Sequence, residues 1–236
     1  MIVKQVESCA QAVADIPHGA TVMIGGFGEA GSPIELIHAL IDHGAKDLTI
    51  VSNNTGSGRV GLAALIAAGR VAKMVCSYPR SANSTVFPEL FRAGRIRLEL
   101  VPQGTLAERI RAGGAGIPAF YTPSAVGTTL AEGKESRTFD GREYILEHAI
   151  RADFALVRAD RADRYGNLTF SKTARNFGPI MCTAARCAIA QTRCIAEPGQ
   201  IDPESVITPG IFVQRIVHVA RPLQESRLVR EGAVYP

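Results

Sequence analysis

A glycine-rich stretch near the N-terminus constrains the fold more than any other part of the sequence. It follows the apolar run Thr21–Ile24, which has the composition of a buried β-strand, and has four glycines within Gly25–Gly31. Glycine allows a sharp turn and leaves backbone amides open to a ligand. Ser32 then predicts a helix N-cap, with Pro33 in the first turn and Glu35 completing a capping box. Strand, glycine loop and helix N-terminus in this order favour anion binding.

The same stretch leaves two other interpretations open. Gly26, Gly28 and Gly31 fall at the spacing of a dinucleotide-binding loop, so the chain could be an NAD- or nucleotide-binding α/β module. The acidic residue that such a module needs about twenty positions later is missing, because Ser52 and two asparagines stand there. A glycine-rich turn that binds nothing is the third possibility.

Segments with strand and helix patterns alternate through the first half of the chain. Strands are expected at 48–51, 71–76 and 96–101, and helices at 34–41, 60–68 and 87–93. This alternation predicts βαβ units, and hence an open, mainly parallel α/β sheet with helices on both faces. Ligands bind beyond the carboxyl ends of the strands in such sheets. The glycine loop, the Asn53-Asn54 loop and the Gln103 loop should therefore converge on one cleft.

The second half of the chain does not continue this regular alternation of strand and helix patterns. The segment 113–123 is rich in glycine and proline and is interpreted as a long functional loop, after a second capping box at Thr105–Glu108. Further strands are expected at 144–146, 154–157, 168–170 and 188–194, and a helix at 180–185. We expect one domain over residues 1–220. Residues 221–236 have little periodic pattern and are expected to trail over the surface or a partner.

Composition excludes several classes of function. With 26 basic and 22 acidic residues, no basic run and no tryptophan, the chain does not have the pattern of a nucleic-acid-binding protein. No apolar run is long enough to cross a bilayer, and Met1–Gln5 does not begin a secretion signal, so we expect a cytoplasmic protein without membrane contact. The five cysteines fit no zinc motif and are expected to be free thiols, and we predict no metal site.

Several blocks of sequence, in chain order, resemble the A subunit of the family I CoA-transferases. These blocks are Gly25–Pro33, Asn53–Gly56, Val101–Gly104, Leu106–Gly113, Gly127-Thr128, Ala131–Glu135, Ala174–Phe177 and Thr208–Ile211. They extend over nearly the whole chain, to about Val219. One glycine loop would be a weak signal, whereas an ordered series is specific. The resemblance implies the open, Rossmann-like α/β fold of that family.

The resemblance also implies site residues and a partner. Gln103 and Gly104 would lie near the reacting carbonyl, where an amide can donate to a developing oxyanion. The CoA-contacting element would comprise Gly25, Gly26, Phe27, Gly28, Glu29, Ala30 and Gly31. In this family a glutamate of the B subunit carries the acyl group and then CoA, and this chain has no Ser-Glu-Asn-Gly block to supply it. The chain should therefore be active only with a B subunit, in a heterodimer or heterotetramer, with CoA as a substrate and no cofactor.

Two branches of the family compete for the substrate. Cys76–Arg80 and Ser84–Phe87 resemble enzymes that move CoA from succinyl-CoA to 3-oxoadipate, whereas Gly113–Tyr121 resembles the branch that uses acetoacetate. We favour 3-oxoadipate, and hypothesise that Arg80 pairs with its distal carboxylate, while Asn53 and Asn54 shape the pocket. A sugar-phosphate isomerase-like domain is a more distant alternative, for which no general base is identified.

Overall fold

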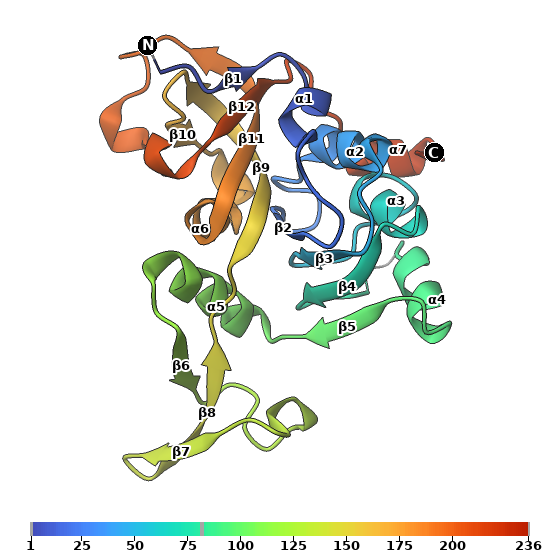
Figure 1. Cartoon of the computed structure of the whole chain (residues 1–236), viewed down its shortest axis with the longest axis vertical. Coiled ribbons are helices and arrows are strands. Elements are labelled where there is room, and N and C mark those ends of the chain that lie inside the picture. Colours follow the sequence, from blue (N-terminus) through green and yellow to red (C-terminus); the bar gives the residue numbers. More distant parts are fainter. Residues whose placement is uncertain (1, 81–82, 236) are drawn as a thin grey trace.

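The computed structural model of the protein describes residues 2–80 and 83–235 (Figure 1). Its main sheet is open, with strand order β1-β12-β11-β9-β2-β3-β4-β5, and each neighbouring pair along this order is parallel. The strands are β1 (Gln5–Val6), β2 (Thr21–Ile24), β3 (Leu48–Val51), β4 (Val71–Cys76), β5 (Arg97–Leu100), β9 (Ala152–Asp163), β10 (Leu168–Thr169), β11 (Ala185–Ala196) and β12 (Arg215–His218). The short β10 pairs with β9 in the antiparallel sense.

Helices cover both faces of this sheet, which confirms the predicted fold class. The helices are α1 (Cys9–Val13), α2 (Ile34–His43), α3 (Gly61–Ala67), α4 (Val86–Arg92), α5 (Gln103–Ala115), α6 (Gly178–Ala184) and α7 (Glu225–Arg230). Successive residues of a strand face opposite sides. Accordingly Val22 and Ile24 of β2 pack in the cluster formed with α1–α4, and Met23 packs in the cluster formed with α5 and α6.

A three-stranded antiparallel sheet projects from the main body as an arm (Figure 1). It consists of β6 (Ala119–Thr122), β7 (Ser136–Phe139) and β8 (Arg142–His148), in the order β6-β8-β7. The prediction of one long irregular segment over 113–123 is therefore wrong. Helix α5 continues to Ala115 and ends at Gly116 in the left-handed conformation, and β6 follows. Gly113 and Gly114 of α5 allow close packing against the residues just before β9 and against α6.

Neither predicted capping box forms. Pro33 is the N-cap of α2, without a side-chain cap, and Glu35 contacts the distant Gln191 and Leu223. Helix α5 begins at Gln103, so Thr105 lies inside its first turn and is buried. The start of α2 is thus stabilised by a tertiary contact, from Leu36 N to Gln191, and neither helix start has a side-chain cap.

The C-terminal residues pack on the body of the molecule. Helix α7 lies beside α2 and α3, and Glu225 at its start is buried, so the segment that was expected to trail over the surface contains a helix and packs on the body (Figure 1). The domain boundary at residue 220 stays a prediction. Short 3₁₀ helices complete the chain: η1 (Thr129–Ala131), η2 (Lys172–Arg175), η3 (Pro203–Ser205) and η4 (Gly210–Phe212). Across the described residues, no helix has the length and apolar character that spanning a bilayer requires.

Candidate functional site

A cavity of about 570 Å³ opens at the carboxyl ends of the central parallel strands. It lies where the loops after β2, β3 and β4 and the start of α5 come together. Its lining comprises Phe27, Gly28, Asn53, Asn54, Ser57, Ser77, Tyr78 and Gln103. The three loops that were expected to meet at this edge of the sheet all contribute to it. Ser77 and Tyr78 add a fourth loop, in which sequence reasoning assigned a role only to Arg80.

Asn53 is the polar centre of this cavity. Its side chain is buried, and its Oδ1 accepts hydrogen bonds from Gln103 Nε2 at 2.7 Å and from Ser77 Oγ at 2.7 Å. Its backbone carbonyl accepts from the amide of Tyr78 at 2.9 Å. These contacts join the loops after β3 and β4 to the first residue of α5. The Gln103 carboxamide is thereby held in a fixed orientation, while the residue itself remains exposed to the cavity.

The glycine loop makes a tight turn that presents its tip to the cavity. Phe27 and Ala30 exchange backbone hydrogen bonds of 3.0 and 3.2 Å. Within residues 2–80 and 83–235, no protein acceptor meets the amides of Gly28 and Glu29 at the tip. The N-terminus of α2 is not open in this way, because Leu36 N donates to the buried Gln191 Oε1 at 3.2 Å. A ligand would therefore meet the loop tip and not the helix end.

Asn176 fixes the shape of this loop, a role that the local pattern did not reveal. Its Oδ1 accepts from Gly26 N at 3.2 Å, and its Nδ2 donates to Ala30 O at 2.8 Å. Gly31 lies close to the same segment: a Cβ there would come within 2.6 Å of Ala174 O, and its φ is +79°. The signal for Asn176 was its place in the block Ala174–Phe177, to which no function was attached.

The remaining predicted site residues lie around the cavity without lining it. Gly104 is exposed in the first turn of α5, and Glu29 is half-buried at the tip of the glycine loop. Gly25 is buried at the end of β2, where its amide donates to Leu156 O at 3.0 Å. Arg80 is exposed, two residues beyond Tyr78, and does not line the cavity. Its hypothesised role in substrate recognition stays a prediction.

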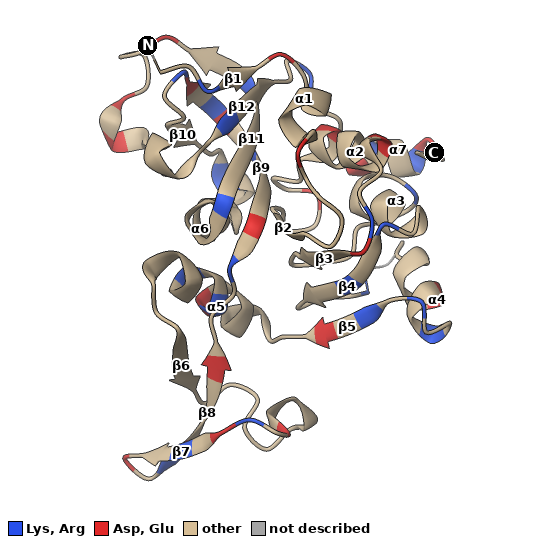
Figure 2. Ribbon diagram, viewed as in Figure 1, with Lys and Arg blue, Asp and Glu red and all other residues tan. Residues whose placement is uncertain are grey.

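The cavity wall is uncharged and exposes more apolar than polar surface. Its described lining contains no aspartate, glutamate, lysine, arginine or histidine, and Phe27 and Tyr78 expose 52% and 60% of their surface beside it. Burial raises the pKa of the adjacent Cys76 thiol to about 12, so this cysteine is not a thiolate nucleophile. Among the described residues, no cluster of three histidine, cysteine, aspartate or glutamate side chains could hold a metal ion. Figure 2 shows basic and acidic residues interspersed along the ribbon.

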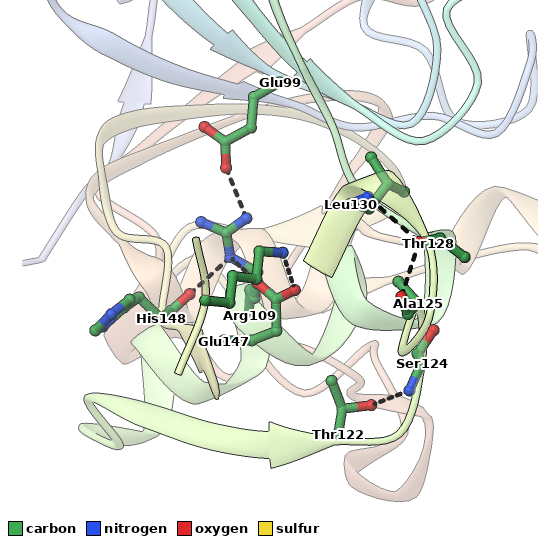
Figure 3. A network of polar contacts seen from close by, with 10 residues as sticks. Glu99, Arg109, Thr122, Ser124, Ala125, Thr128, Leu130, Glu147 and His148 are labelled. Atoms are coloured by element: carbon green, nitrogen blue, oxygen red, sulfur yellow. Dashed lines mark hydrogen bonds and ion pairs between the residues drawn. The ribbon is translucent and has the colours of Figure 1, made fainter. Parts of the chain in front are cut away.

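A network of charges holds the arm against α5, the helix that carries Gln103 (Figure 3). Arg109 of α5 donates through Nη1 to Glu99 Oε1 of β5 at 2.7 Å and through Nε to His148 O of β8 at 2.7 Å. Glu147 of β8 is buried between Arg109 and Lys134, with Lys134 Nζ 2.5 Å from its Oε1. Lys73 of β4 extends the series through Glu99. The main sheet, α5 and the arm are thus connected by alternating charges.

Comparison with known proteins identifies the family. The family model for coenzyme A transferases matches residues 6–219. This chain belongs to the coenzyme A transferase family. The match contains every residue that lines the cavity and ends before α7.

Curated relatives of this CoA-transferase chain match it over nearly their full lengths. It is 61% identical to the A subunit of the 3-oxoadipate CoA-transferase of Pseudomonas putida, over 93% of this chain and 95% of that protein. It is 56% identical to the protein of the same name from Acinetobacter baylyi, over 93% and 96%. It is 50% identical to the A subunit of the succinyl-CoA:3-ketoacid coenzyme A transferase of Xanthomonas campestris, over 92% and 90%.

Solved structures share the fold of this CoA-transferase chain. An acyl-CoA transferase from E. coli O157:H7, in a thioester complex with CoA, superposes with a TM-score of 0.82 at 25% identity. The match covers 94% of this chain and 48% of that one, so this chain corresponds to about half of the E. coli protein. Glutaconate coenzyme A-transferase from Acidaminococcus fermentans gives a TM-score of 0.81 at 20% identity, covering 94% and 78%.

In a CoA-transferase, this arrangement can orient an acyl group but does not itself provide a carboxylate nucleophile. The described lining has amide donors on Asn53 and Gln103, a Ser77 hydroxyl that donates to Asn53, and no aspartate or glutamate. Such neutral donors stabilise negative charge as it develops on a carbonyl oxygen without neutralising a carboxylate beforehand. The family match also favours this chemistry over that of a nucleotide-binding module.

Proposed function

We propose that this chain is the A subunit of a CoA-transferase that moves CoA from succinyl-CoA to 3-oxoadipate, together with a B subunit. The observation that carries the proposal is the single cavity where the tip of the glycine loop, Asn53 and Gln103 meet. Loop-tip amides that have no acceptor among the described residues suit the polar parts of CoA. The Gln103 carboxamide suits the carbonyl at which acyl transfer takes place.

The nucleophile in this proposal is a glutamate of the B subunit. Its carboxylate attacks the thioester carbonyl of succinyl-CoA, which gives a mixed anhydride and releases the CoA thiolate. The thiolate then attacks the glutamyl carbonyl, forming a glutamyl-CoA thioester and succinate. The acceptor carboxylate repeats these two steps in reverse order and takes up CoA. The uncharged wall around Gln103 supports this division of roles, because it offers donors but no described carboxylate.

The proposed acceptor follows from the relatives and from the loop after β4. Two relatives named for 3-oxoadipate are 61% and 56% identical to this chain, against 50% for the Xanthomonas campestris relative named for 3-ketoacids. Tyr78 lines the cavity, and Arg80 follows it in the same loop. A guanidinium there suits the second carboxylate of 3-oxoadipate. Acetoacetate, which has one carboxylate, is the alternative acceptor.

Further parts of the proposal concern the assembly. The relatives are named as A subunits, which supports pairing with a B subunit in a heterodimer or a heterotetramer. CoA takes part as a substrate, and no cofactor is proposed. A cytoplasmic location stays a prediction.

The test is CoA transfer from succinyl-CoA, measured for the chain alone and co-expressed with a candidate B subunit. The acceptors 3-oxoadipate and acetoacetate are offered separately. We expect activity only in the pair, and a higher kcat/KM with 3-oxoadipate. Activity of the chain alone would contradict the division of roles, and a preference for acetoacetate would overturn the acceptor. No transfer by a folded, associated pair would overturn the CoA-transferase proposal itself.

A further inference from the structure

The C-terminal segment, residues 223–235, binds the loop that connects β3 to α3. This segment lies outside the family match, which ends at residue 219. Ser57 N donates to Glu225 Oε1 at 3.0 Å, and Tyr235 N donates to Arg59 O at 2.9 Å. Between them, Val229 of α7 lies against Gly58, where a Cβ would come within 2.7 Å of the valine side chain. Three consecutive residues of the loop thus contact the segment.

This loop is part of the proposed CoA site. It carries Asn54 and Ser57 in the cavity lining and follows directly after Asn53. It contains Gly56 and Gly58, both with positive φ, so its own sequence does little to restrict its conformation. A loop of this composition needs contacts from elsewhere in order to hold one shape.

Glu225 is buried beneath the site. Only 6% of its surface is exposed, and its carboxyl borders a small cavity shared with Gly25, Gly28 and Asn54. Among the described residues, none of the ion pairs involves Glu225. Burial raises the pKa of this carboxyl, and the nearby Glu29 adds to the effect. A buried carboxyl is costly to stability, so its contact with Ser57 points to a role in the site.

The far end of the segment fastens the other end of the loop. The Tyr235 ring stacks on His38 with centroids 3.7 Å apart and planes at 17°, and its hydroxyl donates to Asp42 at 2.7 Å. His38 Nε2 in turn accepts from Gly61 N, the first residue of α3, at 2.9 Å. The loop is therefore held at its middle by Glu225 and at its end through His38.

The segment also reaches the helix that follows the glycine loop. Leu223 N donates to Glu35 Oε1 at 2.5 Å, and Glu35 Oε2 accepts from the buried Gln191 Nε2 at 2.6 Å. The C-terminal segment thus contacts elements that hold both loops lining the cavity, the glycine loop and the β3–α3 loop.

We propose that the C-terminal segment is a positioning element for the CoA site, and that Glu225 is the positioning residue that fixes the β3–α3 loop through Ser57 N. The inference rests on the proposed function, because it concerns the site of that reaction. If the loop is ordered before CoA binds, less conformational entropy is lost on binding and the affinity is higher. Loss of the contact should therefore weaken succinyl-CoA binding and leave the chemical step largely intact.

Kinetics of the pair with the B subunit provide the first test. Glu225→Ala removes the acceptor, and we expect KM for succinyl-CoA to rise about tenfold while kcat changes less than about twofold. Glu225→Gln keeps an oxygen that accepts from Ser57 N and should stay close to the wild type. Glu231→Ala, at the exposed end of the same helix, is the matched control. If Glu225→Gln behaved like Glu225→Ala, or if neither changed KM, the positioning role would be wrong.

Hydrogen exchange of the full chain provides a readout independent of activity. In Glu225→Ala the amide of Ser57 should exchange at least about tenfold faster than in the wild type, with β3 unchanged. Faster exchange without a rise in KM would overturn the link to CoA. If the wild-type pair showed no transfer at all, the proposed function would fail. Protection of the loop amides by added CoA, in wild type against Glu225→Ala, would then still decide the positioning role.

A milder change covers the case in which Glu225→Ala does not fold. Shortening the chain to end at Ala233 removes the Tyr235 ring and its bond to Arg59 but leaves Glu225 in place. This variant should show faster exchange at Gly61 and a rise in KM for succinyl-CoA of about threefold. Unchanged exchange and unchanged KM would contradict the proposal.

Discussion

Gln103 Nε2 lies 2.7 Å from Asn53 Oδ1, although the two residues are 50 positions apart in the chain. The contact joins the first residue of α5 to the loop after β3. It also shares its acceptor with Ser77 Oγ. The orientation of the Gln103 carboxamide therefore depends on two loops. A change in either loop should alter the hydrogen bond between Gln103 Nε2 and Asn53 Oδ1.

Removal of the Gln103 carboxamide should impair the chemical step. For Gln103→Ala we expect kcat to fall about a hundredfold, as for other single donors to a developing oxyanion. Because Asn53 acts through the same contact, the double variant Asn53→Ala with Gln103→Ala should lose less kcat than the product of the two single-variant losses. Steady-state kinetics of the pair with the B subunit measure both. Glu108→Gln, on the exposed side of α5, is the control, and fully multiplicative losses would show that the two residues act separately.

Arg80 should distinguish the two acceptors. Arg80→Ala is expected to lower kcat/KM for 3-oxoadipate about tenfold and to leave that for acetoacetate within about twofold, because only 3-oxoadipate has a second carboxylate to pair with. Arg92→Ala on α4 controls for the loss of a nearby positive charge. Equal losses with both acceptors would assign Arg80 a structural role only.

Two glycines of α5 should respond in opposite directions to alanine. A Cβ on Gly113 would lie 2.1 Å from the backbone oxygen of Ile150, so Gly113→Ala should destabilise the protein by about 3 kcal/mol. At Gly104 nothing lies within 4 Å, so Gly104→Ala should stabilise the helix by roughly 0.5 kcal/mol. Urea unfolding of the two variants measures both values. A stable Gly113→Ala variant would mean that α5 lies further from β9 than described.

The arm should loosen when its buried charge is removed. Glu147 is buried between Arg109 and Lys134, so Glu147→Ala leaves two cations short of a partner and should cost about 3 kcal/mol of stability. The exposed Glu135 is the control, and Glu135→Ala should cost much less stability than Glu147→Ala. Thermal unfolding compares the loss of stability in the two variants. Equal losses would argue against the charge network as the support of α5.

His38 should make stability fall in mild acid. Burial lowers its pKa to about 4, a shift that the nearby Asp42 partly opposes. Between pH 6.5 and 4 the unfolded chain takes up a proton that the folded chain does not, so stability is lost as the pH falls through this range. His38→Gln should remove roughly 1–2 kcal/mol of that loss, measured by urea unfolding at pH 7.5 and 4.5. An unchanged difference in stability between the two pH values in His38→Gln would contradict this assignment.

The repeating strand and helix patterns of the first half predicted the fold well. Apolar runs such as Thr21–Ile24 and Leu48–Val51 coincide with strands because both faces of a parallel sheet are buried. The capping boxes failed because helix ends have tertiary partners that a local pattern does not contain. Gln191, for example, bonds Leu36 N across 155 positions. Likewise, the glycines at 113–114 indicated a loop, but they allow close contact with the residues just before β9 and with α6.

The site was predictable where it follows from topology. Parallel strands place their following loops at one edge, and this rule alone predicted that Asn53 and Gln103 would lie together. The contribution of Tyr78, the bonds of Asn176 and the burial of Glu225 depend on contacts between distant segments. No spacing along the sequence reports such contacts, so the roles of these residues became visible only in the structure, although Tyr78 and Asn176 lie in blocks that carry the family resemblance.

The pairing of β1 with β12 sets the order in which this protein can be completed during synthesis. Gln5 lies opposite Ile216, and Val6 opposite Val217, so the first strand of the chain is the neighbour of the last. At translation rates of about 5–20 residues per second, β1 waits roughly 10–40 s for its partner to be made. Strands β2 to β5 are adjacent in both sequence and sheet and can assemble meanwhile. A nascent chain that stops before Arg215 therefore lacks β12, and β1 has no strand to pair with. This edge of the sheet, formed by β12 and β1, is completed last.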